Sequence, residues 1–211
     1  EVGHQNLGAG RVVQQELKRI STAIDNGSFF ENSALDAAFA HAESSGKRVH
    51  LIGLVSLGQV HSDREHLIAI IEMAQKRGIP RKSLVIHAIT DGRDTPPNAG
   101  LECLAGIELV LKKANFQPIA SVIGRFWAMD RDKRWERIQR AYNCLVGPAE
   151  HHATDSAEAL RHYYENPEGD SLKGDEFVTP TAIANDDGST ANTRVQDGDA
   201  IIFFNFRGDR P

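Results

Sequence analysis

The segment Leu84–Asp94, LVIHAITDGRD, joins a short apolar run to a loop that carries acids and an arginine. Its apolar part, Leu84–Ile89, is rich in β-branched residues, as a strand buried on both faces of a parallel sheet should be. Three more runs have this character: Val49–Val55, Ile119–Ile123 and Ala200–Phe204. The sequence therefore predicts at least four buried strands.

Segments with helical spacing of apolar residues lie between and around these runs. Strand and helix alternate from Val49 to Val146, which favours βαβ crossovers. We therefore expect an α/β fold of three layers, with a mostly parallel sheet and helices on both faces. The segment Asn166–Asp199 breaks the pattern and is expected to be irregular, with a short strand at Thr181–Ala184. The expected helices are Arg11–Asn26, Ser33–Ser45 with a capping serine, His66–Arg77, Asn98–Ala114, Asp132–Val146 and Asp155–Glu165.

Composition excludes several classes of protein. The 211 residues suffice for one sizeable core, and the net charge of −5 argues against nucleic acid as the main partner. Cys103 and Cys144 are too few for a disulfide-stapled secreted scaffold and are interpreted as packing residues in a reducing compartment. No apolar run approaches membrane-spanning length and no signal peptide is apparent. We expect a cytoplasmic protein with no membrane partner.

Charged side chains follow each of the four predicted strands. His61 lies in the loop Ser56–Ser62, and the other loops contain the sequences DGRD, GR with DRDKR, and NFRGDR. Ligands of open α/β sheets bind outside the carboxyl ends of the strands, so these loops should converge on one crevice. The residues expected to line it are His61, Arg93, Asp94, Arg125, Arg131, Arg207 and Arg210.

Five arginines suit a small ligand with more than one anionic group, because guanidinium pairs bidentately with carboxylate or phosphate. Nearby acids would orient and partly neutralise them: Asp91, Asp94, Asp130, Asp132 and Asp209. The competing interpretation is that each Arg-Asp pair is a surface ion pair worth under about 1 kcal/mol. That interpretation is favoured for Lys133, Arg134 and Arg137, at the start of a predicted helix. His50 and His87 are expected to be core histidines, and His151-His152 to lie in a solvated turn.

Read in order, these motifs resemble the cofactor-independent phosphoglycerate mutases. The matching segments are Glu1–His4, Asn6–Arg11, Val60–Ser62, Asp91–Asp94, Gly124-Arg125, Ala128–Trp135 and Phe204–Arg207. Each is short, but together they run from the first residue to the last in the family's order.

The resemblance implies an enzyme that interconverts 2- and 3-phosphoglycerate in glycolysis. In the family, a phosphatase-like domain carries two divalent metals, commonly manganese, and a serine that becomes phosphorylated; an inserted α/β domain holds the glycerate. Residues 1–10 would then be a linker from the phosphatase-like domain, 11–206 the inserted domain and 207–211 the start of the return linker. The family's substrate-binding positions match His61, Arg93, Asp94, Arg125, Arg131, Arg207 and Arg210. Asp94 would be the catalytic acid/base for the glycerate hydroxyls.

Two departures and the chain's extent qualify this picture. Leu57 and Gln59 replace an aspartate and a glycine of the family's Ser-Asp-Gly-Gly-Val-His-Ser loop, and Gly208 replaces a usual proline or alanine. The resemblance places the nucleophilic serine and the metal ligands outside these residues, so we expect the chain alone to lack mutase activity and a manganese site. The alternatives are a stand-alone phosphoglycerate-binding module and, given Leu57 and Gln59, a structural domain that has lost ligand binding.

Overall fold

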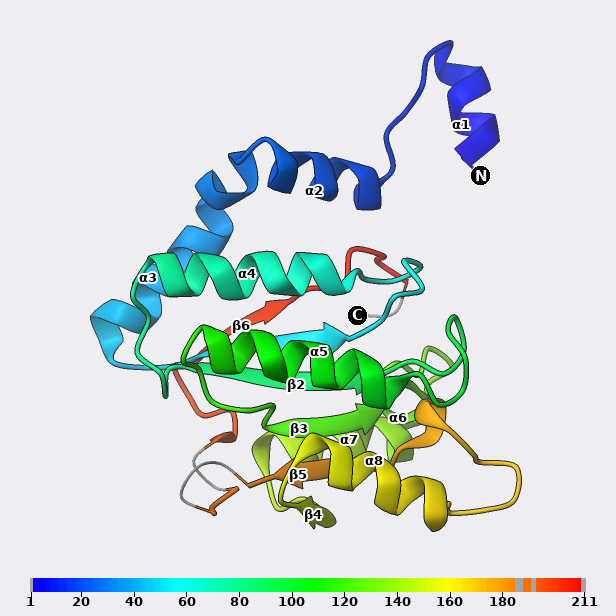
Figure 1. Ribbon diagram of the computed structural model, residues 1–211. Coiled ribbons are helices and arrows are strands. Elements are labelled where there is room, and N and C mark those ends of the chain that lie inside the picture. Colours follow the sequence, from blue (N-terminus) through cyan, green and yellow to red (C-terminus); the bar gives the residue numbers. More distant parts are fainter. Residues whose placement is uncertain (1, 185–187, 191–192, 210–211) are drawn as a thin grey trace.

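The structure, a computed structural model, describes residues 2–184, 188–190 and 193–209. Its centre is a six-stranded sheet with strand order β4-β5-β3-β2-β1-β6 (Figure 1). The strands are β1 Val49–Leu54, β2 Leu84–Thr90, β3 Ser121–Gly124, β4 His151–Ala153, β5 Thr181–Ile183 and β6 Ala200–Phe203. Strands β6, β1, β2 and β3 are mutually parallel, whereas β5 runs antiparallel to β3. The expected mostly parallel sheet is confirmed.

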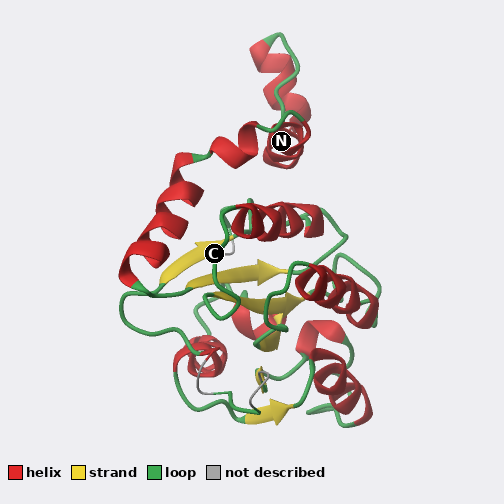
Figure 2. Ribbon diagram, turned by 60° about the vertical axis from the view of Figure 1, so that its left-hand side comes forward, coloured by secondary structure: helices red, strands yellow, loops and turns green. Residues whose placement is uncertain are grey.

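Helices cover both faces of this sheet. The helices of the described chain are α1 Val2–Ala9, α2 Glu16–Asp25, α3 Ser33–Ser45, α4 Arg64–Lys76, α5 Gly100–Lys113, α6 Arg125–Ala128, α7 Trp135–Val146 and α8 Ser156–Glu165, with short 3₁₀ turns η1 Ser28–Glu31 and η2 Asp175–Phe177. Helices α4, α5 and α8 lie in front of the sheet in Figure 1, and α3 and α7 lie behind it; Figure 2 shows the same layers from the side. The three-layer α/β prediction is thus correct. Helix α1 stands apart from these layers.

The core forms where the apolar runs meet the helices. Every residue of β1 and β2 is buried, as expected of strands covered on both faces. The largest cluster includes the fully buried Leu51, Ile86, Leu104 and Ile107. Cys103 in α5 and Cys144 in α7 are buried free thiols. Among the described residues, no helix has the length and apolar character needed to cross a membrane.

Two local predictions were wrong. Ser33 does not cap α3: the cap is Asn32, whose side chain accepts hydrogen bonds from the N–H groups of Ala34 and Leu35 at 3.0 and 3.1 Å. His151 and His152 lie in β4 rather than in a turn. Both are exposed, and β4 exists because it pairs with β5, a contact that the local sequence does not reveal.

A chain of buried polar groups crosses the sheet near its middle. His50 Nε2 lies 3.1 Å from Asp199 Oδ2, and His50 Nδ1 lies 2.9 Å from His87 Nε2. His87 Nδ1 in turn lies 2.8 Å from Ser121 Oγ. A carboxylate only accepts, so His50 donates to Asp199, His87 donates to His50, and the hydroxyl of Ser121 donates to His87. Both histidines are therefore hydrogen-bonded core residues, as expected.

These hydrogen-bonded histidines predict that the folded protein loses stability in acid. Burial, with a smaller effect of His50, lowers the pKa of His87 from 6.5 to about 3. Below pH 6.5 His87 therefore binds a proton in the unfolded chain but stays neutral in the folded protein. The free energy of unfolding falls as the pH drops from 6.5 towards 3. At pH 5 this group alone should cost roughly 2 kcal/mol relative to pH 8. Urea unfolding should show that the stability difference between pH 8 and pH 5 is smaller in His87→Gln than in wild type. An equal difference in the two proteins would show that His87 does not cause the loss of stability.

Candidate functional site

The four parallel strands all end at one edge of the sheet, and the loops that follow them meet there. Asn205, after β6, accepts a hydrogen bond from the N–H of Leu54 at the end of β1 (2.9 Å). Asp94, after β2, lies 3.8 Å from His61, after β1, and 2.6 Å from Arg125, which follows β3. The loops predicted to converge therefore do so.

Arg125 lies at the centre of this edge. It is the first residue of α6 and its side chain is only 3% exposed. One guanidinium nitrogen, Nη1, donates to Asp91 Oδ1 at 2.7 Å and to Asp94 Oδ2 at 2.6 Å. Burial lowers the pKa of Arg125, but the hydrogen bonds to the two carboxylates outweigh it and raise the pKa above its ordinary value. A permanent positive charge is thus fixed between two acids.

Asp91 holds the loop after β2 in shape. Its carboxylate accepts from the Ser56 hydroxyl at 2.5 Å and from the N–H groups of Arg93 and Asp94 at 3.1 and 2.9 Å. Burial raises the pKa of Asp91, but these hydrogen bonds and that from Arg125 lower it below its usual range. Gly92 has φ of +67° in the same turn, which glycine adopts without strain. Asp91 therefore orients Arg93 and Asp94 at the edge.

His61 is buried between two carboxylates without bonding to either. Its Nε2 lies 3.8 Å from Asp94 Oδ2 and its Nδ1 lies 3.8 Å from Asp209 Oδ1, both beyond hydrogen-bond distance. Nδ1 is a buried nitrogen with no hydrogen-bond partner within the described part of the chain. Burial, together with the positive charges of Arg125 and Arg207, lowers the pKa of His61. His61 thus places a neutral imidazole at this edge, with its Nδ1 atom free to form a hydrogen bond.

The loop that carries His61 contains the two unusual residues, Leu57 and Gln59. Leu57 is half exposed. Gln59 has φ of +56°, a left-handed conformation that explains why glycine is usual there. Its side chain offsets part of that strain by donating to Asp63 Oδ2 at 2.7 Å. The backbone carbonyl of His61 accepts from the N–H of Phe206 at 2.9 Å, which ties the loop to the chain after β6.

The more exposed arginines each have a carboxylate partner. Arg93 Nη1 lies 3.3 Å from Glu176 Oε1, and its side chain is 60% exposed. Arg131 and Arg207 share Asp209, at 2.9 and 2.8 Å. Arg210, the remaining candidate, lies outside the described residues. The mutual repulsion of the arginines is thus relieved within the site, and an anionic ligand would have to compete with these acids.

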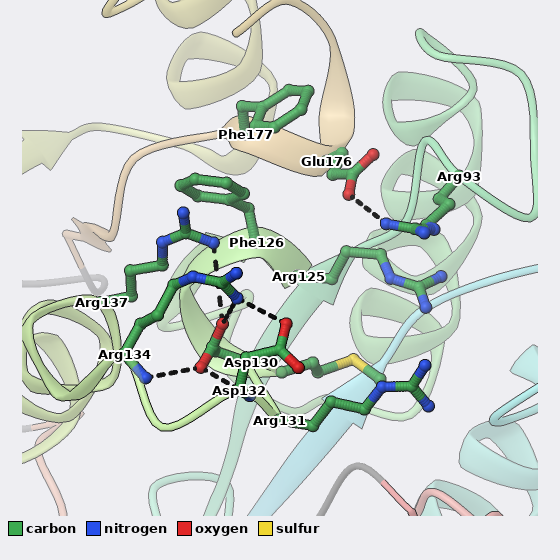
Figure 3. Close-up of a pocket in the computed structure, with 11 residues that line it drawn as sticks. Arg93, Arg125, Phe126, Asp130, Arg131, Asp132, Arg134, Arg137, Glu176 and Phe177 are labelled. Atoms are coloured by element: carbon green, nitrogen blue, oxygen red, sulfur yellow. Dashed lines mark hydrogen bonds and ion pairs between the residues drawn. The ribbon is translucent and has the colours of Figure 1, made fainter.

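A pocket of about 440 Å³ opens beside these groups (Figure 3). Its lining is Arg93, Arg125, Phe126, Met129, Asp130, Arg131, Asp132, Arg134, Arg137, Glu176 and Phe177. Arg134 donates to Asp130 and Asp132 at 2.9 and 2.5 Å, and Arg137 lies 3.6 Å from Asp130, so both are salt-bridged as expected. His61, Asp94 and Arg207 are not part of this lining and lie next to it, around Arg125 and Asp209.

Glu176 and Phe177 were not anticipated as site residues. They belong to η2, within the segment expected to be irregular, and reach the pocket through long-range packing. Phe177 packs against Phe126, with ring centroids 5.0 Å apart. The only local signal is Gly174, whose φ of +89° marks a turn but not its destination.

Within the described residues, no group of three or more histidine, cysteine or carboxylate side chains is arranged to hold a metal ion. The charged and polar side chains that meet at this edge are guanidinium, carboxylate and imidazole groups.

Comparison with known proteins identifies the family. The model described as "BPG-independent PGAM N-terminus" matches residues 20–211. The 2,3-bisphosphoglycerate-independent phosphoglycerate mutases of Rhodopirellula baltica and Listeria innocua are each 48% identical over 210 residues, covering 100% of this chain and 38% and 39% of theirs. The structure resembles that of Leishmania mexicana phosphoglycerate mutase at low cobalt concentration, with a TM-score of 0.85, 31% identity, and coverage of 95% of this chain and 37% of that one. This chain thus spans about two fifths of the length of these relatives. It belongs to the family of cofactor-independent phosphoglycerate mutases.

Proposed function

We propose that this chain is the substrate-binding part of a phosphoglycerate mutase and binds 2- and 3-phosphoglycerate at the carboxyl edge of its sheet. The observation that carries the proposal is Arg125, a buried charge fixed between Asp91 and Asp94 and flanked by the incompletely bonded His61. Around it lie Arg93, Arg131 and Arg207, whose exposed guanidinium groups suit the carboxylate and phosphate of a phosphoglycerate.

Asp94 is the proposed acid/base for the glycerate hydroxyls. Its carboxylate is partly exposed and anchored by Arg125, so it is both accessible and held in place. A carboxylate within reach of a hydroxyl can take its proton and return it to the other hydroxyl. His61, kept neutral by its surroundings, is proposed to hydrogen-bond the glycerate and limit its rotation. Arg210 is proposed to join Arg207 in binding the anionic groups.

For the whole enzyme we propose interconversion of 2- and 3-phosphoglycerate through a phosphoserine formed in a phosphatase-like domain. Two divalent metals, commonly manganese in the family, would activate that serine and stabilise phosphate charge when bound there. Residues 11–206 would form the inserted domain and 1–10 and 207–211 its connections, which the separate position of α1 supports. We place this activity in the cytoplasm, where Cys103 and Cys144 would stay reduced. The 211 residues alone are proposed to bind substrate without turning it over.

A domain that has lost its ligand is the less supported alternative. Leu57 and Gln59 suggested a disturbed His61 loop, yet His61 remains buried beside Asp94 and Asp209. A stand-alone phosphoglycerate-binding module would use the same residues and differs only in lacking the phosphatase-like partner.

Calorimetric titration with 3-phosphoglycerate tests the binding proposal. Arg93→Ala should weaken binding about 10- to 100-fold, because one charged hydrogen-bonding group is worth roughly 1.5–3 kcal/mol. Arg19→Ala is the matched control: Arg19 is also paired with a glutamate and is 61% exposed, but it lies on α2. Its affinity should equal that of wild type. Equal affinities in all three proteins would contradict the proposed site.

A further inference from the structure

The segment Gly174–Phe177, which contains η2, is packed unusually tightly into the wall of the pocket. A β-carbon on Gly92 would lie 2.7 Å from the backbone nitrogen of Glu176, and one on Gly124 would lie 2.5 Å from its carbonyl oxygen. Gly92 lies in the loop that follows β2, and Gly124 is the last residue of β3, directly before Arg125. The backbone of Glu176 is therefore held between the loop that follows β2 and the end of β3.

Hydrogen bonds on both sides of Glu176 fix this position. The carbonyl of Asp175 accepts from the Thr90 hydroxyl at 2.7 Å, and its side chain accepts from the N–H of Gly100, at the start of α5, at 2.6 Å. The carbonyl of Phe177 accepts from Trp127 Nε1 at 3.0 Å. The segment cannot move away without breaking bonds to β2, α5 and α6.

The side chain of Glu176 lies at the pocket wall and faces Arg93 (Figure 3). Their separation of 3.3 Å exceeds the 2.5–2.9 Å of the other arginine–carboxylate hydrogen bonds described at this site. Arg93 is also the most exposed arginine of the set. Because Arg93 is well exposed and the hydrogen bond is long, the pair should contribute about 1 kcal/mol, so an incoming anion can displace Glu176 from Arg93 at little cost.

Arg93 and Glu176 differ in how freely their side chains can move when an anion binds. Arg93 has a long, exposed side chain and can turn to a ligand, whereas Glu176 is only 18% exposed on a fixed backbone. Its negative charge therefore stays at the wall when Arg93 leaves, close to any anion in the pocket. Such a charge weakens the binding of every anion, because it repels the ligand's negative charge.

We propose that Glu176 is a built-in counter-ion that holds Arg93 in the empty site and lowers the pocket's affinity for anions. This inference rests on the proposed binding of phosphoglycerate to the same arginines. Glu176 acts on the ligand through charge and through Arg93, and it takes no part in proton transfer.

Glu176→Gln tests this role, since it removes the charge and keeps the shape and a hydrogen-bond acceptor for Arg93. Calorimetry should show 3-phosphoglycerate binding roughly 3- to 10-fold more tightly than in wild type at low salt, and the gain should shrink as salt is added. Glu168→Gln is the control, because Glu168 also pairs with an arginine, Arg140, but does not line the pocket. That variant changes net charge equally and should bind as wild type does.

The outcomes separate the two proposals. If wild type binds no phosphoglycerate, or Arg93→Ala binds as well as wild type, the proposed function and this inference fail together. If wild type binds and Arg93→Ala is weakened, but Glu176→Gln binds equally or less tightly, only the counter-ion role is overturned. A merely structural role for Glu176 would give weaker binding, opposite in sign to the expected gain.

Discussion

Arg125→Met should destabilise the protein by about 3–5 kcal/mol and abolish phosphoglycerate binding, because breaking a buried ion pair leaves an uncompensated charge. Asp91 is as buried as Arg125, each side chain being 3% exposed, and would lose its principal cationic partner. Methionine fills much of the same volume, so the loss would reflect charge rather than a cavity. Urea unfolding at pH 7 measures the first effect, and titration with 3-phosphoglycerate measures the second.

Arg134→Met provides the stability control. Arg134 also bridges two aspartates, Asp130 and Asp132, but its side chain is 43% exposed. Its replacement should cost within about 1 kcal/mol, as exposed pairs do. The difference in unfolding free energy between wild type and Arg125→Met should also become smaller at about pH 4, because carboxylates that have lost their cationic partner are protonated there and carry no charge. Equal losses in both variants, or a loss independent of pH, would contradict the assigned role of Arg125.

Gly124→Ala should destabilise the protein by about 3 kcal/mol through overpacking alone. Gly124 has φ −63° and ψ 142°, which any residue adopts, so alanine adds no backbone strain. Its β-carbon, however, would lie 2.5 Å from the carbonyl oxygen of Glu176 and 2.6 Å from the nitrogen of Val178. These are backbone atoms that can yield only if η2 moves. The affinity of Gly124→Ala for 3-phosphoglycerate should also differ from that of wild type, because η2 carries Glu176.

Gly147→Ala is the matched control for that experiment. Gly147, at the end of α7, also lacks a positive φ, and its added β-carbon would meet its nearest neighbour at an ordinary 3.4 Å. Thermal unfolding should show this variant within about 0.5 kcal/mol of wild type, as for substitutions away from such packing. If Gly124→Ala is equally harmless, η2 is not held by close packing between the loops.

The parallel part of the fold could be predicted from the sequence because its signal is local. The strands β1 and β2 are buried at every position, so their apolar runs are continuous and visible. The short strand predicted at Thr181–Ala184 is confirmed as β5, whose three residues are buried, whereas β4 is equally short and largely exposed and gives no comparable signal. Their pairing depends on contacts between distant segments.

Some residues of the site could likewise be predicted from the local sequence, and others could not. Arg93, Asp94 and Arg125 directly follow strands, and the sheet brings them together by its topology. Glu176 belongs to a segment without strand or helix periodicity. It lies at the pocket because of its packing on Gly92 and Gly124 and the hydrogen bonds of its two neighbours in the chain. The unusual Gln59 could be identified from the family pattern, but its positive φ and its bond to Asp63 could not.

A crystal structure of the protein with 3-phosphoglycerate tests the central claim most directly. The ligand should lie at the carboxyl edge of β1, β2 and β3, contacting Arg125 and Arg131, with its glycerate next to Asp94 and His61. Arg93 should have turned from Glu176 to the ligand. Ligand bound elsewhere on the protein, or an unliganded edge in crystals grown at a concentration that saturates binding in solution, would contradict the claim.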